Sequence, residues 1–328
     1  METFLERERT SQTVFKQSSP YISESARADG YYRGKSRTFC LPTEYAEQNL
    51  FPEIKSHALA YFATHKIKWH QGQNAKPNNH MCSSQVCCVN FLFPFSNNPE
   101  SLAHVLRPIF PIQAMLPIEN GQYVAFEWIG EKDYLCEKGS HNGPRTRGAN
   151  CTSADAAVMF ERTDGRKQIV LIEWKYTESY GGSSLEKSKS GTYRTNIYKN
   201  LFVSHDCPIE RDLLTSFESL FFEPFYQLMR QQFLANEMEK AHELGADHVS
   251  VLHIAPTHNR EFFKITSPEL KDLGDSAMQV WKKLVKSPDG FTSISTEQLF
   301  GGLSAEQLPE MNTWLEYIQA RYTWVRMP

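Results

Sequence analysis

The most constraining feature of this sequence is a pair of apolar segments joined by a short turn. The first segment begins at Thr152–Asp155 and the second is Ile169–Lys175. Between them, Thr163–Gly165 has the composition of a hairpin turn, because glycine tolerates a positive φ. The stretch Ile169–Ile172 is too apolar for an edge strand and predicts a central strand buried on both faces. The sequence therefore predicts an antiparallel hairpin inside a buried sheet.

Charged side chains interrupt this apolar hairpin. Glu173 and Lys175 share one face of their strand while Trp174 points to the other, since side chains alternate along a strand. Charges embedded in an apolar strand are costly unless something compensates for their burial. A divalent cation held by Asp155 and Glu173, with Lys175 beside it, would supply that compensation. The alternative is an ordinary solvated strand face, since this spacing also occurs by chance.

The length of the turn decides whether the two carboxylates share a face. A two-residue Asp164-Gly165 turn would place Asp155 opposite Trp174, with its carboxylate on the wrong side of the sheet. A three-residue loop with Gly165 in the left-handed conformation shifts the register by one and places Asp155 opposite Glu173. We therefore expect an odd-length or bulged turn, or a break in the strand near Asp155. The carboxylate oxygens should then lie within ~5 Å of each other, as ~2 Å bonds to one ion require.

Composition limits the class of protein. The chain has 328 residues, of which 40% are hydrophobic and 12% aromatic, which indicates a globular chain with a substantial core. No run approaches the ~20 apolar residues of a spanning helix and no signal peptide opens the sequence, so we expect a cytoplasmic protein with no membrane partner. Seven scattered cysteines fit reduced thiols better than a disulfide framework. The net charge of −3 means that any nucleic acid would need a local basic groove.

The pattern along the chain predicts three parts. Residues 1–40 are polar and irregular, and we expect an extended or poorly ordered N-terminal arm. Residues 41–265 form the expected core, and residues 266–328 a helical C-terminal extension packed on it. The other elements that we expect are a helical segment at 43–65 interrupted near Pro52, a buried helix at 81–93, strands at 122–128, 134–136 and 249–255, a long helix from Pro224 to near Gly245, and a short strand pairing at 291–294.

Two motifs resemble ligand-binding sites but lack the spacing or residues that such sites need. Gly30–Ser36 has three residues between its glycines where a phosphate-binding loop needs four, and no apolar strand precedes it. His80 and the cysteines that follow it lack the matching second pair of a zinc site. We therefore assign neither a phosphate-binding loop nor zinc.

The charged hairpin resembles the catalytic core of the PD-(D/E)XK nucleases. The expected element order of helix, three strands, helix and strand matches the core order of that superfamily. One departure is Ala154, which stands where the proline that names the motif would be. Further blocks resemble a bacterial group of restriction endonucleases over roughly residues 40 to 300: Trp69-His70, Ser83-Ser84-Gln85, Arg147–Asn150, Ile172–Glu178 and Pro224–Gln231.

This resemblance implies an α/β fold with a restriction-endonuclease-like core, in which helices flank a central mixed β-sheet. It also implies hydrolysis of DNA by Mg²⁺, with Mn²⁺ as a substitute, in restriction or phage defence. Asp155 and Glu173 would supply carboxylate ligands and the carbonyl of Trp174 a third oxygen. Lys175 would orient the attacking water and stabilise the transition state. DNA is the expected partner, no small-molecule cofactor is expected, and a homodimer is left open.

Other residues have less direct predicted roles, each beside a plainer alternative. Glu137 is either an extra acidic ligand or a charge at a loop edge. Gln227, Arg230 and Gln231 share a helix face, which either approaches the site or is solvated. A local basic rim that contacts nucleic acid, or else a set of solvated side chains, consists of Arg145, Arg147, Lys187, Lys189 and Arg194.

Two alternative functions remain at this stage. The first is a nucleic-acid-binding or scaffolding module that kept the fold and lost catalysis. The presence of Asp155, Glu173 and Lys175 together argues against it, because a decayed site usually loses one such residue. The second is a nuclease that acts on RNA or on branched repair intermediates, since a metal site of this kind contacts only a phosphodiester.

Overall fold

The computed structural model describes residues 2–137, 144–188 and 191–326. None of the helices in these ranges is both long enough and apolar enough to cross a membrane. The helices are α1 Phe4–Ser18, α2 Lys55–Thr64, α3 Ser84–Leu92, α4 Pro99–Leu106, α5 Thr195–Val203, α6 Phe225–Lys240, α7 Ala277–Leu284, α8 Thr296–Phe300 and α9 Asn312–Arg321. The strands are β1 Gly30–Tyr32, β2 Lys35–Arg37, β3 Ile112–Leu116, β4 Ala125–Trp128, β5 Ala154–Arg162, β6 Lys167–Trp174, β7 His248–Ala255 and β8 Phe291–Ser295.

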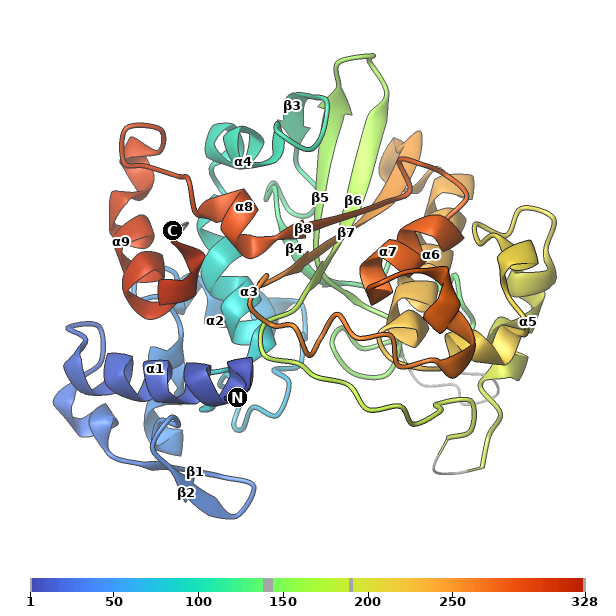
Figure 1. The fold of residues 1–328 in the computed structure, drawn as a ribbon. Coiled ribbons are helices and arrows are strands. Elements are labelled where there is room, and N and C mark those ends of the chain that lie inside the picture. Colours follow the sequence, from blue (N-terminus) through green and yellow to red (C-terminus); the bar gives the residue numbers. More distant parts are fainter. Residues whose placement is uncertain (1, 138–143, 189–190, 327–328) are drawn as a thin grey trace.

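A mixed sheet forms the centre of the molecule (Figure 1). Its strand order is β3-β5-β6-β7-β8, and β4 also pairs with β5. The β5–β6 pair is antiparallel, whereas β6, β7 and β8 run parallel to one another. Helices cover both faces of this sheet, as a parallel region requires. The predicted α/β fold with a helix-flanked, mixed, restriction-endonuclease-like sheet is therefore confirmed.

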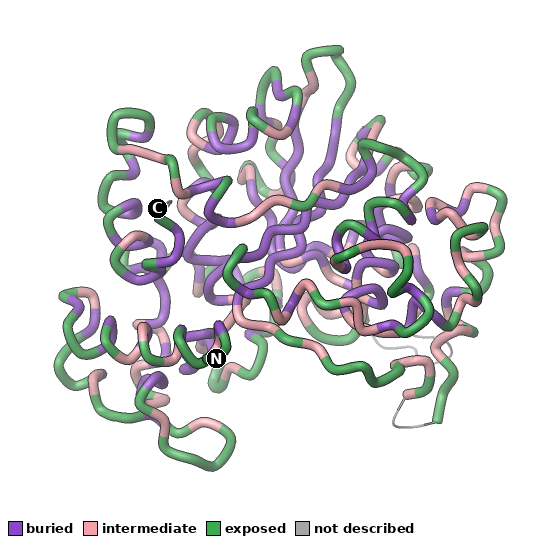
Figure 2. The backbone as a smooth tube through the Cα atoms, in the orientation of Figure 1, coloured by how far each residue is buried: buried purple, intermediate pink, exposed green. Residues whose placement is uncertain are grey.

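The alternation of side chains along β6 divides the core in two. Val170, Ile172 and Trp174 belong to a cluster with α3, α8 and α9. Ile169 and Leu171 belong to the opposite cluster, together with α6 and α7. The central strands are buried along most of their length (Figure 2). Glu173 has the same parity as Ile169 and Leu171, so its side chain faces α6.

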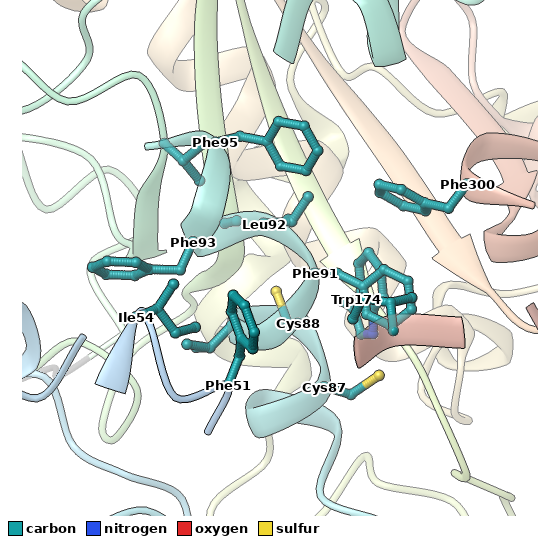
Figure 3. Close-up of a cluster of buried hydrophobic side chains, with 14 of the residues drawn as sticks. Phe51, Ile54, Cys87, Cys88, Phe91, Leu92, Phe93, Phe95, Trp174 and Phe300 are labelled. Carbon is teal, nitrogen blue, oxygen red and sulfur yellow. The ribbon is translucent and has the colours of Figure 1, made fainter. Parts of the chain in front are cut away.

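Helix α3 anchors the charged strand from the side opposite α6. Ser83 caps its first turn by accepting a hydrogen bond from the Val86 amide at 3.4 Å. Phe91 packs against Trp174 with ring centroids 5.0 Å apart and against Phe300 at 5.1 Å (Figure 3). The predicted buried helix is confirmed, and its contact with Trp174 holds the end of β6 in place.

The prediction of an extended or poorly ordered N-terminal arm is wrong. Residues 4–18 form α1, which begins with a capping box between Thr3 and Glu6. Phe4 and Phe15 are buried, and α1 lies against α9 (Figure 1). The helix was missed because its buried face also carries polar residues such as Gln12, whose partners come from distant parts of the chain.

Most other expected elements are confirmed, and one is not. The helical segment interrupted near Pro52, the strands at 249–255 and 291–294, and the helix that follows Pro224 are all present. The expected strand at 134–136 is not observed: the structure describes these residues as a bend followed by irregular backbone. Leu135 is buried against the α6 side of the core without strand pairing, and Cys136 adopts a φ of 49°. Apolar character alone therefore did not distinguish a buried loop from a strand.

Arg321 joins the two ends of the chain. It is fully buried, and its guanidinium donates hydrogen bonds to the Gln12 side chain at 3.1 Å, to the Asn49 carbonyl at 2.6 Å and to the Met81 carbonyl at 3.1 Å. These acceptors lie in α1 and in segments far from α9 in the sequence. Burial of the guanidinium is possible because its donors find oxygen partners.

We predict that Arg321→Ala lowers the free energy of unfolding by about 3–5 kcal/mol, because it leaves several buried acceptors without a donor. Urea denaturation of wild type and variant measures the difference. Arg326→Ala is the control, since Arg326 is exposed; its effect should stay within about 0.5 kcal/mol. Equal unfolding midpoints for the two variants would show that the Arg321 contacts do not hold the ends of the chain together.

We also predict a pH dependence from Glu8 of α1. Its buried carboxylate accepts hydrogen bonds from the Tyr176 hydroxyl and the Trp324 indole, and burial raises its pKa from 4.5 to about 7. The folded state therefore retains a proton that the unfolded state releases. The resulting stability is complete below pH 4.5 and is lost as the pH rises through 7, up to about 3 kcal/mol in total.

Glu8→Gln removes this titration, so its stability relative to wild type should rise between pH 5 and pH 8. Urea denaturation at the two pH values measures this change. Glu2→Gln, at an exposed position, should show no such trend. A Glu8→Gln variant that parallels wild type at both pH values would contradict the assignment.

Candidate active site

The turn between β5 and β6 has the predicted odd length. Gly165 adopts a φ of 81°, and Ala156 pairs with Ile172, so the register is the one that a three-residue loop requires. Continued by one residue, this register places Asp155 opposite Glu173. The hairpin prediction is therefore confirmed, and Asp155 and Glu173 point to the same face of the sheet.

The pairing of β5 with β6 ends at Ala156 and Ile172, next to Asp155. The Oδ2 atom of Asp155 accepts a hydrogen bond from the Trp174 amide at 2.7 Å, so the side chain takes the place of a backbone partner. Strand β5 itself continues through Asp155 to Ala154, which pairs with Trp128 of β4, so the odd-length turn accounts for the shared face and the alternative, a break in the strand, is not observed. The short distance expected between the carboxylate oxygens of Asp155 and Glu173 stays a prediction.

Glu173 is held from two sides. Its Oε1 atom forms an ion pair with Lys175, and its Oε2 atom accepts a hydrogen bond from Gln231 of α6 at 3.0 Å. Gln231 also donates to the carbonyl of Ser153 at 2.7 Å, which links α6 to the residues before Asp155. This contact supports the expectation that the face of α6 approaches the site.

Lys175 is a charged donor in a nearly closed environment. Its side chain is 8% exposed and its backbone amide donates to the Ile254 carbonyl of β7 at 2.8 Å. Burial lowers the pKa of Lys175, but the surrounding acidic groups, of which Glu173 contributes most, together outweigh this effect and hold that pKa well above its usual value. The ammonium therefore stays protonated at neutral pH.

Glu127 is a site residue that the sequence interpretation missed. The pairs Phe126–Ala156 and Trp128–Ala154 flank it, so the register of β4 and β5 places it beside Asp155. Its Oε1 atom accepts a hydrogen bond from Gln85 at 2.6 Å. The sequence does contain a pattern that could have identified it, because Glu127 is a charged residue within an apolar strand, as Glu173 is.

Burial and repulsion between carboxylates dominate the electrostatics. Burial, followed by the Glu173 charge, holds the pKa of Asp155 well above its usual value. Burial raises the pKa of Glu127 to about 7, although the hydrogen bond from Gln85 opposes this effect. A cation among these groups would relieve the repulsion.

The oxygen atoms at this site suit Mg²⁺, which is held in proteins by one or two carboxylates together with water and substrate oxygens. Asp155 and Glu173 would hold the ion, and the Trp174 carbonyl would supply a further oxygen. In the structure this carbonyl accepts a hydrogen bond from the Ser84 hydroxyl at 3.3 Å. The Oε1 atom of Gln231 is buried without a hydrogen-bond partner. In the described parts of the chain, no group of three or more His, Cys, Asp or Glu side chains is already arranged to hold a metal ion.

These groups open into a cleft of about 750 Å³. Glu127, Asp155 and Lys175 line it, and Gln227 and Arg230 of α6 extend the lining. The cleft is much more polar than a typical small-molecule pocket, with a cationic donor beside two carboxylates. Such an arrangement can hold a metal ion and an anionic substrate together.

The other predicted acidic ligand lies elsewhere. Glu137 accepts hydrogen bonds from the Thr152 amide at 2.5 Å and the Tyr198 hydroxyl at 2.8 Å, and it lies 3.9 Å from the Arg230 guanidinium. It does not line the cleft. The structure thus gives Glu137 the role of holding Thr152 and Arg230 in place, and Glu127 occupies the position expected of the third carboxylate.

The predicted basic rim does not line the cleft either. Arg145 donates to the carbonyls of Ile129 and Gly130, and Arg147 forms an ion pair with Glu119 at 2.7 Å. Both guanidinium groups therefore support loops. The other members are dispersed: Lys187 lies over the Tyr193 ring and Arg194 over the Tyr226 ring, whereas Lys189 lies outside the described residues.

The sheet order and the Asp155–Glu173–Lys175 arrangement define a protein of the restriction-endonuclease-like class. The family described as Restriction Endonuclease associating with ARP (REase-ARP) matches residues 9–323, so the chain belongs to that family. Searches of curated proteins and of solved structures gave no match. The family description supports a nuclease with a DNA substrate.

The metal site leads to a prediction that does not depend on cleavage. Mg²⁺ at about 100 times its Kd should stabilise the fold by about 2.7 kcal/mol and raise the Tm by at least about 3 °C. Asp155→Asn should abolish this rise, because it removes a ligand. Without metal, the variant should be at least as stable as wild type at pH 8, because it also removes repulsion from Glu173.

Calorimetry or a thermal-shift assay with and without Mg²⁺ checks both parts. Asp275→Asn serves as the control, since Asp275 is exposed and lies outside the cleft lining. A wild-type-sized Mg²⁺ shift in the Asp155→Asn protein would exclude Asp155 as a ligand.

Proposed function

We propose that the protein is a Mg²⁺-dependent endonuclease of the PD-(D/E)XK type that hydrolyses phosphodiester bonds in DNA, with Mn²⁺ as a substitute metal. The observation that carries this proposal is the convergence of Asp155, Glu173 and Lys175: Asp155 and Lys175 line a polar cleft, and the buried Glu173, on the same face as Asp155, is ion-paired with Lys175. The match to a restriction-endonuclease family supports a role in restriction or phage defence. The free cysteines are consistent with a cytoplasmic location.

Each residue has a distinct task in the proposed reaction. Bound Mg²⁺ would polarise the scissile phosphate and make a water molecule more acidic. Asp155 and Glu173 would hold the ion, and Gln231 fixes the orientation of Glu173. Lys175, charged and anchored by Glu173, would donate a hydrogen bond to the attacking water and stabilise the negative charge that develops on the phosphate.

Glu127 gives this site a group that titrates near neutral pH. Its pKa of about 7 suits a residue that exchanges a proton at physiological pH. It lies beside Asp155 in the β4–β5 pairing and lines the same cleft, where the substrate would bind. We therefore assign Glu127 a supporting role in proton transfer, behind the three principal residues.

Incubation of the purified protein with plasmid DNA, linear and single-stranded DNA, and RNA, with and without Mg²⁺, tests the proposal. We predict Mg²⁺-dependent cleavage of DNA. Asp155→Ala, Glu173→Ala and Lys175→Ala should each reduce the rate by at least about 100-fold, because each removes a metal ligand or the charged donor.

Asp275→Ala and Lys271→Ala are matched controls at exposed positions and should cut like wild type. Circular dichroism should show that all five variants are folded. Wild-type rates in all three site variants would refute the assigned site. Cleavage of RNA but not DNA would show that the protein is a ribonuclease. Binding of nucleic acid without cleavage would favour the alternative of a nucleic-acid-binding or scaffolding module.

A further inference from the structure

The cleft has a second wall, which comes from the N-terminal segment. Leu5 and Arg9 lie one helical turn apart on α1 and both line the cleft. Tyr32 and Arg33, from the hairpin of β1 and β2, line it as well. In Figure 1, α1 and this hairpin lie together at one side of the molecule, below the central sheet in this view. We call this surface the N-terminal wall.

The N-terminal wall is rich in arginines that lack acidic partners. Among the described residues, Arg9, Arg33 and Arg37 form no ion pair. The Nε atoms of Arg9 and Arg37 are buried without a hydrogen-bond partner. Burial, followed by the charges of Arg9 and Arg33, lowers the pKa of nearby His80 to about 4. The imidazole is therefore neutral at physiological pH and carries no charge of its own beside these arginines.

The hairpin presents its cations towards the same side. Tyr32 packs edge-on against His80, with ring centroids 4.6 Å apart, and hydrogen-bonds to Gln71. Lys35 is the direct partner of Tyr32 in the β1–β2 pairing, so the two side chains share a face. Arg37 follows two residues later on that face. Clustered cations of one sign repel one another, so an anion bound between them would be stabilised.

A chain of contacts connects the N-terminal wall to the carboxylates. The Tyr32 hydroxyl hydrogen-bonds to Gln71, the neighbour of His70 in the chain, and the His70 amide donates to Gln85 at 2.8 Å. Gln85 in turn donates to Glu127 at 2.6 Å. One cleft therefore has a cationic wall at one side and the Asp155 site at the other. A ligand that occupies both needs more than one anionic group along its length.

We propose that Arg9 and Arg33 bind backbone phosphates of a nucleic-acid strand on one side of the bond that is cut, with Lys35 and Arg37 adding positive potential. This inference rests on the proposed function. A polynucleotide fits because its regularly spaced phosphates can occupy the N-terminal wall while another phosphate reaches Asp155 and Lys175. The sequence-based search for a basic groove did not find this surface, because its cations come from two separate N-terminal segments.

Fluorescence anisotropy with a labelled DNA duplex and a labelled single strand tests the inference. The titrations use protein with Lys175→Ala, so that no cleavage occurs, at several salt concentrations. Adding Arg9→Ala and Arg33→Ala should weaken binding at least tenfold. It should also reduce the slope of log Kobs against log salt by about 1.8 on the duplex, because two phosphate contacts are lost. Arg33→Ala alone should give about half of this reduction.

Controls separate charge loss from misfolding. Arg166→Ala, at the tip of the β5–β6 hairpin and remote from the cleft, should leave affinity and slope unchanged. Arg33→Lys retains the charge and should retain the slope. Since Arg33 is exposed, its substitution leaves the fold intact even if Arg9, which packs on Phe39, proves structural.

The outcomes distinguish this inference from the proposed function. If wild type cuts DNA and the arginine variants bind with the wild-type slope, the N-terminal wall does not bind phosphates and the nuclease assignment survives. If nothing is cut but binding depends on Arg9 and Arg33, the wall is supported and the catalytic proposal fails. If a mononucleotide binds as tightly as the oligonucleotide with the same arginine dependence, the polynucleotide inference is overturned.

Discussion

The register of the β5–β6 hairpin is the constraint on which the candidate site depends. Because strand side chains alternate, a shift of one residue would move Asp155 to the other face of the sheet from Glu173. Gly165, in the left-handed conformation, allows the odd-length loop that avoids this shift. One glycine at the far end of the hairpin therefore controls which side chains meet at the cleft.

The resulting cluster is electrostatically costly, and the surrounding structure offsets only part of the cost. Asp155, Glu127 and Glu173 come from adjacent strands, and burial raises the pKa values of the first two. Lys175 and Gln231 compensate Glu173 directly. A fold selected for stability alone would replace such a cluster with apolar side chains, so the charges are better explained by a reaction that needs them.

The two ends of the chain complete the molecule around this site. Arg321 of α9 and Gln12 of α1 are joined through a buried hydrogen bond, and Glu8 reaches the Tyr176 hydroxyl just beyond Lys175. These contacts fix α1 beside the end of β6. The N-terminal segment is therefore an integral part of the fold, and it brings Arg9 to the cleft that Asp155 also lines.

The sequence by itself determined the central elements and the principal residues. The apolar run with an embedded Glu-x-Lys predicted the buried strand. The turn composition predicted a hairpin, and the need for Asp155 and Glu173 to share a face predicted its odd-length loop, because strand alternation is a local property of the chain. Only the tertiary structure decided the rest. In the tertiary structure Glu127 lies beside Asp155, and residues 4–18 form a helix with a buried face. The side chains of Arg145 and Arg147 stabilise loops instead of lining the cleft. These outcomes depend on partners that are remote in sequence. A local pattern of polar and apolar residues does not show whether a charged side chain will be solvated, will bind a loop carbonyl or will pair with a group across the core.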